Sequence, residues 1–199
     1  MKKMLFCLAL AAIGSSFATA QDGERMFKRF KGDVSFGYAA PLNSNENGGF
    51  LFAMEPKISI IDQLAVGLRI EAAVTAKFSG NDMYGDPQVD DAKGFASYLA
   101  TADYYFTKNY SFRPFIGGGA GVFGLASDEY DTFNGNNTDI KFGGMFRAGA
   151  EIKHFRFGVE FNLIPTTNLV DMNGAVTGTS KNGYIGIKAG FCFGGGPLE

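Results

Sequence analysis

The chain has 199 residues, a formal net charge of −2, 46% hydrophobic residues and 19% charged residues. This length fits one domain, and the nearly even charge balance argues against a nucleic-acid partner. Aromatic residues make up 15% of the chain, beside 28 Gly, a composition typical of β-rich proteins because aromatic side chains suit a pleated surface and Gly suits tight turns.

The first twenty residues have the pattern of a secretory signal. Lys2 and Lys3 give a positive start, Leu5–Ile13 is apolar, and small residues at 18–20 (Ala-Thr-Ala) precede Gln21. The apolar run is too short for a transmembrane helix. We therefore expect a cleaved signal peptide over residues 1–20 and export of the remaining chain.

Period-2 alternation of apolar and polar residues dominates the rest of the sequence after an N-terminal segment at residues 21–31, and it predicts strands. In chain order, the expected strands are Gly32–Ala40, Gly49–Ile61, Leu64–Phe78, Gly94–Phe106, Phe112–Leu125, Asp139–Lys153, Phe155–Leu163 and Tyr184–Phe193. Their lengths suit tilted membrane strands better than the strands of soluble sheets, which average about 5 or 6 residues.

The expected connections alternate between short and long. Short ones fall at 62–63, 107–109 and 153–154, and long polar ones fall at 41–47, 79–93, 126–138 and 165–182. Short periplasmic turns and long extracellular loops are typical of outer-membrane barrels. The sequence thus predicts an all-β fold, a closed antiparallel eight-stranded transmembrane up-and-down β-barrel at residues 32–194, with a C-terminal tail at 195–199 and both ends in the periplasm.

The two faces of the expected strands differ in a way that favours a membrane. One face is apolar, whereas the other carries small residues and charges of both signs, which suit a narrow interior. A soluble barrel would place these faces the other way round. Aromatic residues near strand ends are expected to form an interfacial girdle: Tyr104, Tyr105, Phe106, Tyr110, Phe155, Phe191 and Phe193.

The short turns predict which inward charges face each other. A two-residue loop at 153–154 places Glu151 opposite Arg156 and Arg147 opposite Glu160, and opposed opposite charges stabilise neighbouring strands. Three-residue loops at 107–109 and 61–63 would place Asp103 opposite Arg113 and Glu55 opposite Arg69. The predicted lumenal charge network consists of Glu55, Lys57, Arg69, Glu71, Asp103, Arg113, Arg147, Glu151, Arg156, Glu160 and Lys188.

Two segments carry a resemblance to a known superfamily. They are the strand FRPFIGGGAGV at residues 112–122 and the final strand with Phe191 and Phe193. Over most of Lys31–Phe193, and most specifically at residues 112–122, the chain resembles the small outer-membrane β-barrels that include the OmpX, OmpW and OmpA-barrel families. The resemblance implies an outer-membrane location, insertion by the barrel assembly machinery, and contact with membrane lipid and lipopolysaccharide. One departure is that Gly194–Glu199 follow the terminal aromatic signal.

Sites for chemistry are sparse in the sequence. A G-x-G-x-x-G pattern at residues 119–124 lies inside an expected strand with no helix after it, so nucleotide binding is not expected. His154, the only histidine, falls in a turn, and Cys192 falls on an inward face. Acidic residues cluster in the loops at 82–91 and 128–131, where they would form a solvated surface or hold divalent cations that bridge lipopolysaccharide. We expect no enzyme activity, cofactor or metal.

Two functions fit this interpretation. In the first, the lumen is plugged and four extracellular loops make the protein a structural or surface-contact barrel whose extracellular partner the sequence does not name. The alternative is an OmpW-like conduit for small hydrophobic molecules, which would need an apolar pocket opening from the lumen.

Overall fold

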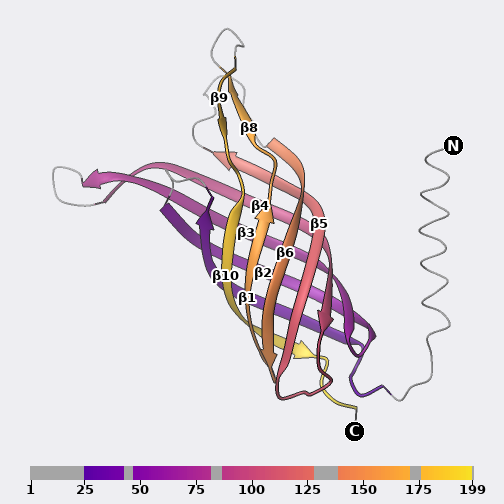
Figure 1. The fold of residues 1–199 in the computed structure, drawn as a ribbon. Coiled ribbons are helices and arrows are strands. Elements are labelled where there is room, and N and C mark those ends of the chain that lie inside the picture. Colours follow the sequence, from indigo (N-terminus) through magenta and orange to yellow (C-terminus); the bar gives the residue numbers. More distant parts are fainter. Residues whose placement is uncertain (1–24, 43–46, 82–86, 128–138, 171–175, 199) are drawn as a thin grey trace, which may run out of the picture.

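The protein folds as a barrel in the computed structural model, which describes residues 25–42, 47–81, 87–127, 139–170 and 176–198 (Figure 1). Residues 21–24 and the expected signal peptide lie outside the described residues. Within the described part, no helix is long and apolar enough to cross a bilayer. The strands are β1 (Phe30–Pro41), β2 (Asn47–Ile61), β3 (Leu64–Asn81), β4 (Pro87–Tyr105), β5 (Arg113–Ser127), β6 (Asp139–Ile152), β7 (Phe155–Leu163), β8 (Thr167–Val170), β9 (Val176–Ser180) and β10 (Tyr184–Gly194).

Eight of these strands close into one antiparallel sheet, in the order β1-β10-β7-β6-β5-β4-β3-β2. Closure is made by β1 and β10, which pair from Lys31 opposite Gly194 to Pro41 opposite Tyr184. Strands β8 and β9 form a separate two-stranded ribbon between β7 and β10. The expected closed eight-stranded barrel is therefore confirmed, and closure leaves no free edge among its strands.

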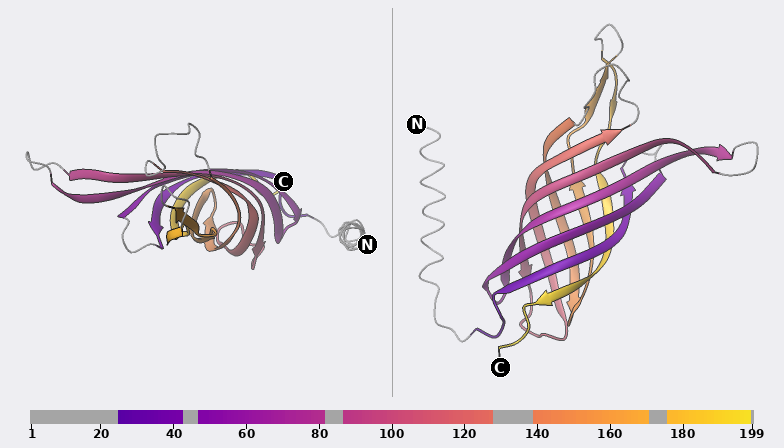
Figure 2. Two further views of the ribbon diagram at one scale, coloured as in Figure 1. Left: turned by 90° about the horizontal axis from the view of Figure 1, so that it is seen from above. Right: turned by 180° about the vertical axis from the view of Figure 1, so that it is seen from behind.

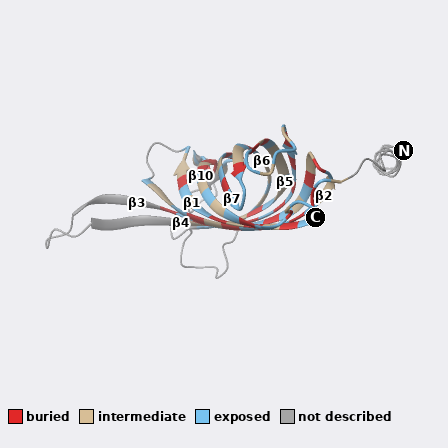
Figure 3. Cartoon of the chain, turned by 90° about the horizontal axis from the view of Figure 1, so that it is seen from below, coloured by how far each residue is buried: buried red, intermediate tan, exposed pale blue. Residues whose placement is uncertain are grey.

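Buried and exposed residues alternate along the barrel strands, as Figure 3 shows. The exposed positions are apolar: Phe142 is 70% exposed, Phe146 65% and Ile187 56%. The buried positions include Arg69 and Asp103, each 0% exposed. Large apolar side chains facing outward around a charged interior are stable only where lipid covers the outside, so the expected orientation of the two faces is confirmed.

Two hairpins extend further than the alternation predicts. The segments expected as loops at 79–93 and 165–182 contain the ends of β3 and β4 and the whole of β8 and β9. The pairing of β3 with β2 ends at Ala76, so the β3–β4 hairpin continues beyond the barrel wall as a ribbon (Figure 2). In such a ribbon about half of the backbone groups pair across the two strands, and the others point away from the partner strand.

The three turns at one end of the barrel differ in length. This end, which we call the turn end, also holds the described chain ends, and the opposite end is the loop end. The β6–β7 turn has two residues, with Ile152 opposite Phe155 and Lys153 at a φ of 55°. The β2–β3 turn also has two residues, and a register shift between Ser59 and Ile61 restores the register expected from three.

The β4–β5 connection is longer than expected. It covers residues 106–112, whereas the sequence interpretation placed a three-residue loop at 107–109. Thr107 donates its hydroxyl to the carbonyl oxygen of Phe112 at 2.9 Å, and the amide of Ser111 donates to Asn109 Oδ1 at 2.9 Å. These local bonds stabilise a wider loop, since side chains compete with the ladder for backbone groups.

The N-terminal segment and the C-terminal tail pair with each other across the turn end. Phe27 forms a β-bridge with Pro197, and the amides of Lys28 and Leu198 donate to the carbonyls of Gly196 and Met26 at 2.9 Å each. We call this pairing, of residues 26–28 with 196–198, the strap. The described part of the predicted N-terminal segment is thus held by backbone hydrogen bonds.

The outward orientation can be tested on β6. Replacing Phe146→Arg places a charge on the lipid face, and we expect a loss of about 2–4 kcal/mol in the free energy of unfolding. Urea titration of the protein folded in phospholipid vesicles measures this loss. Phe146→Leu, the matched apolar control, should cost far less, and an equal cost for both variants would contradict the orientation.

Candidate functional site

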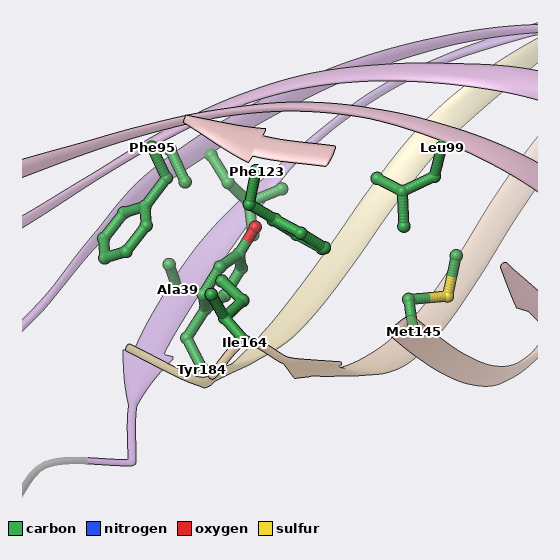
Figure 4. Close-up of a cluster of buried hydrophobic side chains, with 9 residues drawn as sticks. Ala39, Phe95, Leu99, Phe123, Met145, Ile164 and Tyr184 are labelled. Carbon is green, nitrogen blue, oxygen red and sulfur yellow. The ribbon is translucent and has the colours of Figure 1, made fainter. Parts of the chain in front are cut away.

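The interior of the barrel has two layers of different chemistry. Toward the turn end lies a charge network, whose side chains are at most 9% exposed. It consists of Lys31, Asp33, Glu55, Lys57, Arg69, Glu71, Asp103, Arg147, Glu151, Arg156, Glu160 and Lys188. Toward the loop end lies an apolar cluster of Ala39, Leu51, Ala73, Phe95, Leu99, Phe123, Met145, Ile164 and Tyr184 (Figure 4).

Asp103 of β4 is the centre of the charge network. One carboxylate oxygen accepts from Lys57 and Arg156 at 2.8 Å each, and the other accepts from Arg147 Nε at 2.7 Å. Gly117, opposite Asp103 on β5, leaves the room for this arrangement, because a Cβ there would overlap with Asp103 Oδ1. One carboxylate thus holds three cations from three other strands.

Three further carboxylates lie in the part of the network around Asp103: Asp33, which pairs with Lys57 and Arg156, Glu55 and Glu151. Both terminal nitrogens of Arg147 donate to the Glu55 carboxylate at 2.6 Å each, a bidentate pair of the kind that is both strong and directional. Glu151 accepts from Lys31 at 2.7 Å and from the Tyr105 hydroxyl at 2.6 Å, and it also pairs with Arg156.

A second group joins the charge network to the apolar cluster. Arg69 pairs with Glu71 and Glu160, and Lys188 reaches the same two carboxylates at 3.4 and 2.6 Å. The hydroxyl of Tyr184, whose ring belongs to the apolar cluster, donates to Glu71. The network holds six cations and six carboxylates, so its formal charge is neutral.

The predicted charge pairs have mixed outcomes. On β6 and β7, Glu151 is opposite Arg156 and Arg147 is opposite Glu160, as predicted, and both pairs are in contact. The register also places Glu55 across from Arg69, since Met54 faces Ile70 and Lys57 faces Gly67. Their side chains nevertheless turn elsewhere, Glu55 to Arg147 and Arg69 to Glu71 and Glu160.

The predicted pairing of Asp103 with Arg113 is wrong. The seven-residue β4–β5 loop shifts the register, so Asp103 faces Gly117 and Arg113 faces Glu151. Arg113 lies at the turn end, where it donates to the carbonyl of Asp62 at 2.5 Å. Its guanidinium lies between the rings of Phe27 and Tyr105, 4.3 and 4.2 Å from their centroids. Arg113 therefore closes the interior beneath the strap.

Tyr105 was expected in the aromatic girdle and lies instead inside the barrel, 1% exposed. Neighbouring strand residues face opposite sides, so Tyr104 and Tyr105 cannot both meet lipid. The other predicted strand-end aromatics face outward: Tyr104, Phe106, Phe155, Phe191 and Phe193. Tyr110 lies in the β4–β5 loop, with its hydroxyl 3.1 Å from His154 Nε2.

Sequence reasoning missed two charged members of the network, Lys31 and Asp33. The signal was present, because Lys31, Asp33 and Ser35 alternate with outward Val34 and Phe36 on β1. Lys31 was assigned to the N-terminal segment, although β1 begins at Phe30. Asp33 already lies in the expected strand Gly32–Ala40, and a start one residue earlier would have placed Lys31 on the same inward face.

One group of side chains has ligands that could suit a metal. An oxygen of Asp33, an oxygen of Glu151 and the Cys192 sulfur lie within 4.8 Å of one another. Both carboxylates already pair with cations, Asp33 with Lys57 and Glu151 with Lys31. A divalent ion would add uncompensated charge to a neutral, buried network, so this geometry is better explained by ion pairing.

The remaining candidate positions are structural in character. The G-x-G-x-x-G pattern lies within β5, with backbone paired on both sides, as the sequence indicated. The ring of His154 stacks on Phe191 at 5.5 Å, and its Nδ1 lies 3.3 Å from the carbonyl oxygen of Cys192. These contacts pack the β6–β7 turn against the last strand.

An eight-stranded closed sheet with an apolar exterior and a charged, filled interior defines a small outer-membrane type of β-barrel. Solved structures agree on this fold. Neisserial surface protein A is 15% identical, with a TM-score of 0.55, covering 87% of this chain and 99% of that one. The outer-membrane protein OprG from Pseudomonas aeruginosa is 12% identical, with a TM-score of 0.54, covering 87% and 100%. No protein-family model and no curated protein sequence matches the chain.

The role of Asp103 can be tested by removing its charge. Asp103→Asn leaves Lys57, Arg147 and Arg156 with fewer counter-charges in a buried site, and we expect a cost of about 3–5 kcal/mol in the free energy of unfolding. Asp139→Asn is the control, because Asp139 pairs with Lys141 while 42% exposed, and it should cost less than about 1 kcal/mol. Equal costs in vesicle-based urea titrations would contradict a central role for Asp103.

Proposed function

We propose that this protein is a plugged outer-membrane barrel that acts as a structural or surface-contact protein through its loop end. In this proposal the signal peptide is removed, the barrel assembly machinery inserts the chain, and membrane lipid and lipopolysaccharide surround it. The turn end then faces the periplasm, because short turns and both chain ends lie there.

The observation that carries the proposal is the filled interior. The charge network and the apolar cluster occupy it together with Ala65, Tyr105 and Phe115, which pack at the turn end. A lumenal cavity lined by Asp33, Glu55, Arg147 and Lys188, among others, has a volume of 20 Å³, which is room for one water. Barrels with an aqueous channel need about 16 strands. A role that depends on solute flow is therefore not supported.

The loop end offers the surface that remains for contact. The base of the β8–β9 ribbon is tied to the barrel, because Asn182 Nδ2 donates to the Pro165 carbonyl at 2.7 Å and to Thr167 Oγ1 at 2.9 Å. Lys141 donates to the Thr166 carbonyl at 3.1 Å. The side chains of the acidic loop clusters at 82–91 and 128–131 lie outside the described residues, and their role in contact stays a prediction.

The alternative function, a conduit for small hydrophobic molecules, has one observation in its favour. The apolar cluster places hydrophobic side chains in the interior on the loop side, with Ile164 7% exposed at its edge and Phe95 and Tyr184 in ring contact at 5.4 Å. A conduit would need these side chains to separate and admit a guest. The charge network below them offers no apolar path onward.

Electrical recording tests the plugged interior. The purified folded protein in planar bilayers should give no reproducible conductance steps above the lipid baseline, because ion pairs fill the lumen. A large porin added to the same membrane confirms that channels are detectable. Reproducible steps, or swelling of liposomes in small sugars, would overturn the proposal.

Nuclear magnetic resonance tests the alternative. If the apolar cluster admits guests, adding toluene to the folded protein should shift the methyl signals of Leu51, Leu99 and Ile164. The lipid-facing methyls of Leu68 and Ile187 serve as controls for partitioning into the surrounding micelle. Shifts confined to the controls would reject the conduit.

A further inference from the structure

We propose that the turn end carries a binding surface for anionic phospholipid headgroups, formed by Lys28, Arg29, Lys108 and Lys153. We call these four residues the basic rim. The partner is the phosphate of a phosphatidylglycerol-type lipid in the leaflet that meets the turn end. The inference concerns the opposite end of the molecule from the proposed surface-contact role and does not depend on that role.

All four side chains of the basic rim are exposed. The described residues of the turn end outside the lumen contain one further cation, Arg25, which donates to the carbonyl oxygens of Ser59 and Ile60. They contain one carboxylate, Asp62, which is 8% exposed. Its oxygens accept from the Met26 amide, and the Lys108 amine lies 3.6 Å away. Five cations therefore stand against one buried carboxylate in this part of the described chain.

The charge bias is specific to this end. The connections between barrel strands at the loop end, residues 42–46, 82–86, 128–138 and 164–183, contain seven carboxylates and one lysine. Asp22 and Glu24 precede Arg25 and Glu199 follows Leu198, and all three lie outside the described residues. A protein with a uniformly mixed surface would show no such contrast, and a basic surface beside a membrane attracts anionic lipid.

The depth of the basic rim matches that of lipid headgroups. Arg29 precedes Phe30, which faces outward and is 71% exposed. Lys108 follows outward Phe106 by two residues, and Lys153 precedes outward Phe155 by two. Outward aromatics at strand ends mark the boundary between hydrocarbon and headgroups. The cations lie just beyond this boundary, where phosphate groups are found.

The basic rim is linked into one surface by contacts around the mouth of the barrel. The strap joins the segment of Lys28 to the tail, and the bonds of Arg25 and Met26 join it to the β2–β3 turn. Lys108 meets that turn through Asp62, and Tyr110 of the same loop meets His154 beside Lys153. Three separate chain segments thus present their cations at one end, next to one leaflet.

Electron spin resonance with spin-labelled lipids tests this proposal. The folded protein in phosphatidylcholine vesicles should bind labelled phosphatidylglycerol at least about threefold more strongly than labelled phosphatidylcholine. The ratio of the two affinities should fall toward one at about 1 M salt, where charges more than roughly 3 Å apart are largely screened from each other. The wild-type protein alone can overturn the proposal: it would do so if it showed no preference for phosphatidylglycerol, or a preference that salt does not weaken.

Two triple variants locate the surface. The first variant neutralises three rim lysines and should reduce the preference for phosphatidylglycerol at least about threefold: it combines Lys28→Gln, Lys108→Gln and Lys153→Asn. Asn is used at 153 because it tolerates the φ of 55°. The second variant removes the same amount of charge at the loop end and should leave the lipid preference unchanged: it combines Lys93→Gln, Lys141→Gln and Lys181→Gln. Replacing the three rim lysines by Arg should preserve it.

The outcomes separate clearly. Each variant is first checked for folding by its migration in gels with and without boiling. If the rim variant keeps the wild-type preference, or the loop-end variant loses as much, the basic rim is not the binding surface.

Discussion

Asp103 and the three cations around it set the conditions for the rest of the structure. Charged side chains from several strands can meet at this point only if their strands turn the same face inward, and that choice turns the apolar positions to the lipid. Ionised groups are costly to bury unless each finds a partner of opposite charge. Six cations and six carboxylates meet that requirement inside a wall that is apolar on its outer side.

The two interior layers depend on each other through Tyr184. Its ring packs with Phe95 in the apolar cluster, while its hydroxyl reaches Glu71 in the charge network. Ion pairs fix directions and the apolar side chains fill the remaining space, so the interior is closed by two kinds of interaction.

Much of the fold could be predicted from the sequence because the alternation of inward and outward side chains governs every barrel strand. A side-chain period of two residues reveals each membrane strand, and the two-residue turn at 153–154 fixed the register of Glu151 with Arg156. The β4–β5 loop was misjudged because hydrogen bonds of Thr107 and Asn109 extend it, and a shift of register moved Arg113 away from Asp103. Tyr105 lies between the lipid-facing aromatics Tyr104 and Phe106, and the alternation of side chains along a strand places it inside.

Side-chain partners were less predictable than strand register. Glu55 faces Arg69 across the strands, yet each binds a residue from elsewhere in the barrel, since a narrow lumen brings all walls within reach of a long side chain. The ribbons of β3–β4 and β8–β9 were also not predicted, because backbone pairing between two strands leaves no apolar pattern in the sequence.

The bridge between Phe27 and Pro197 means that the two described ends of the chain are neighbours in space. A short linker could join them, and new ends could then be opened in a connection at the loop end. Every strand would keep its partners in such a circular permutant, although the first strand synthesised would be a different one. The closed order of the strands therefore does not determine which strand comes first in the chain, and the order in which the strands are synthesised can vary independently of the fold.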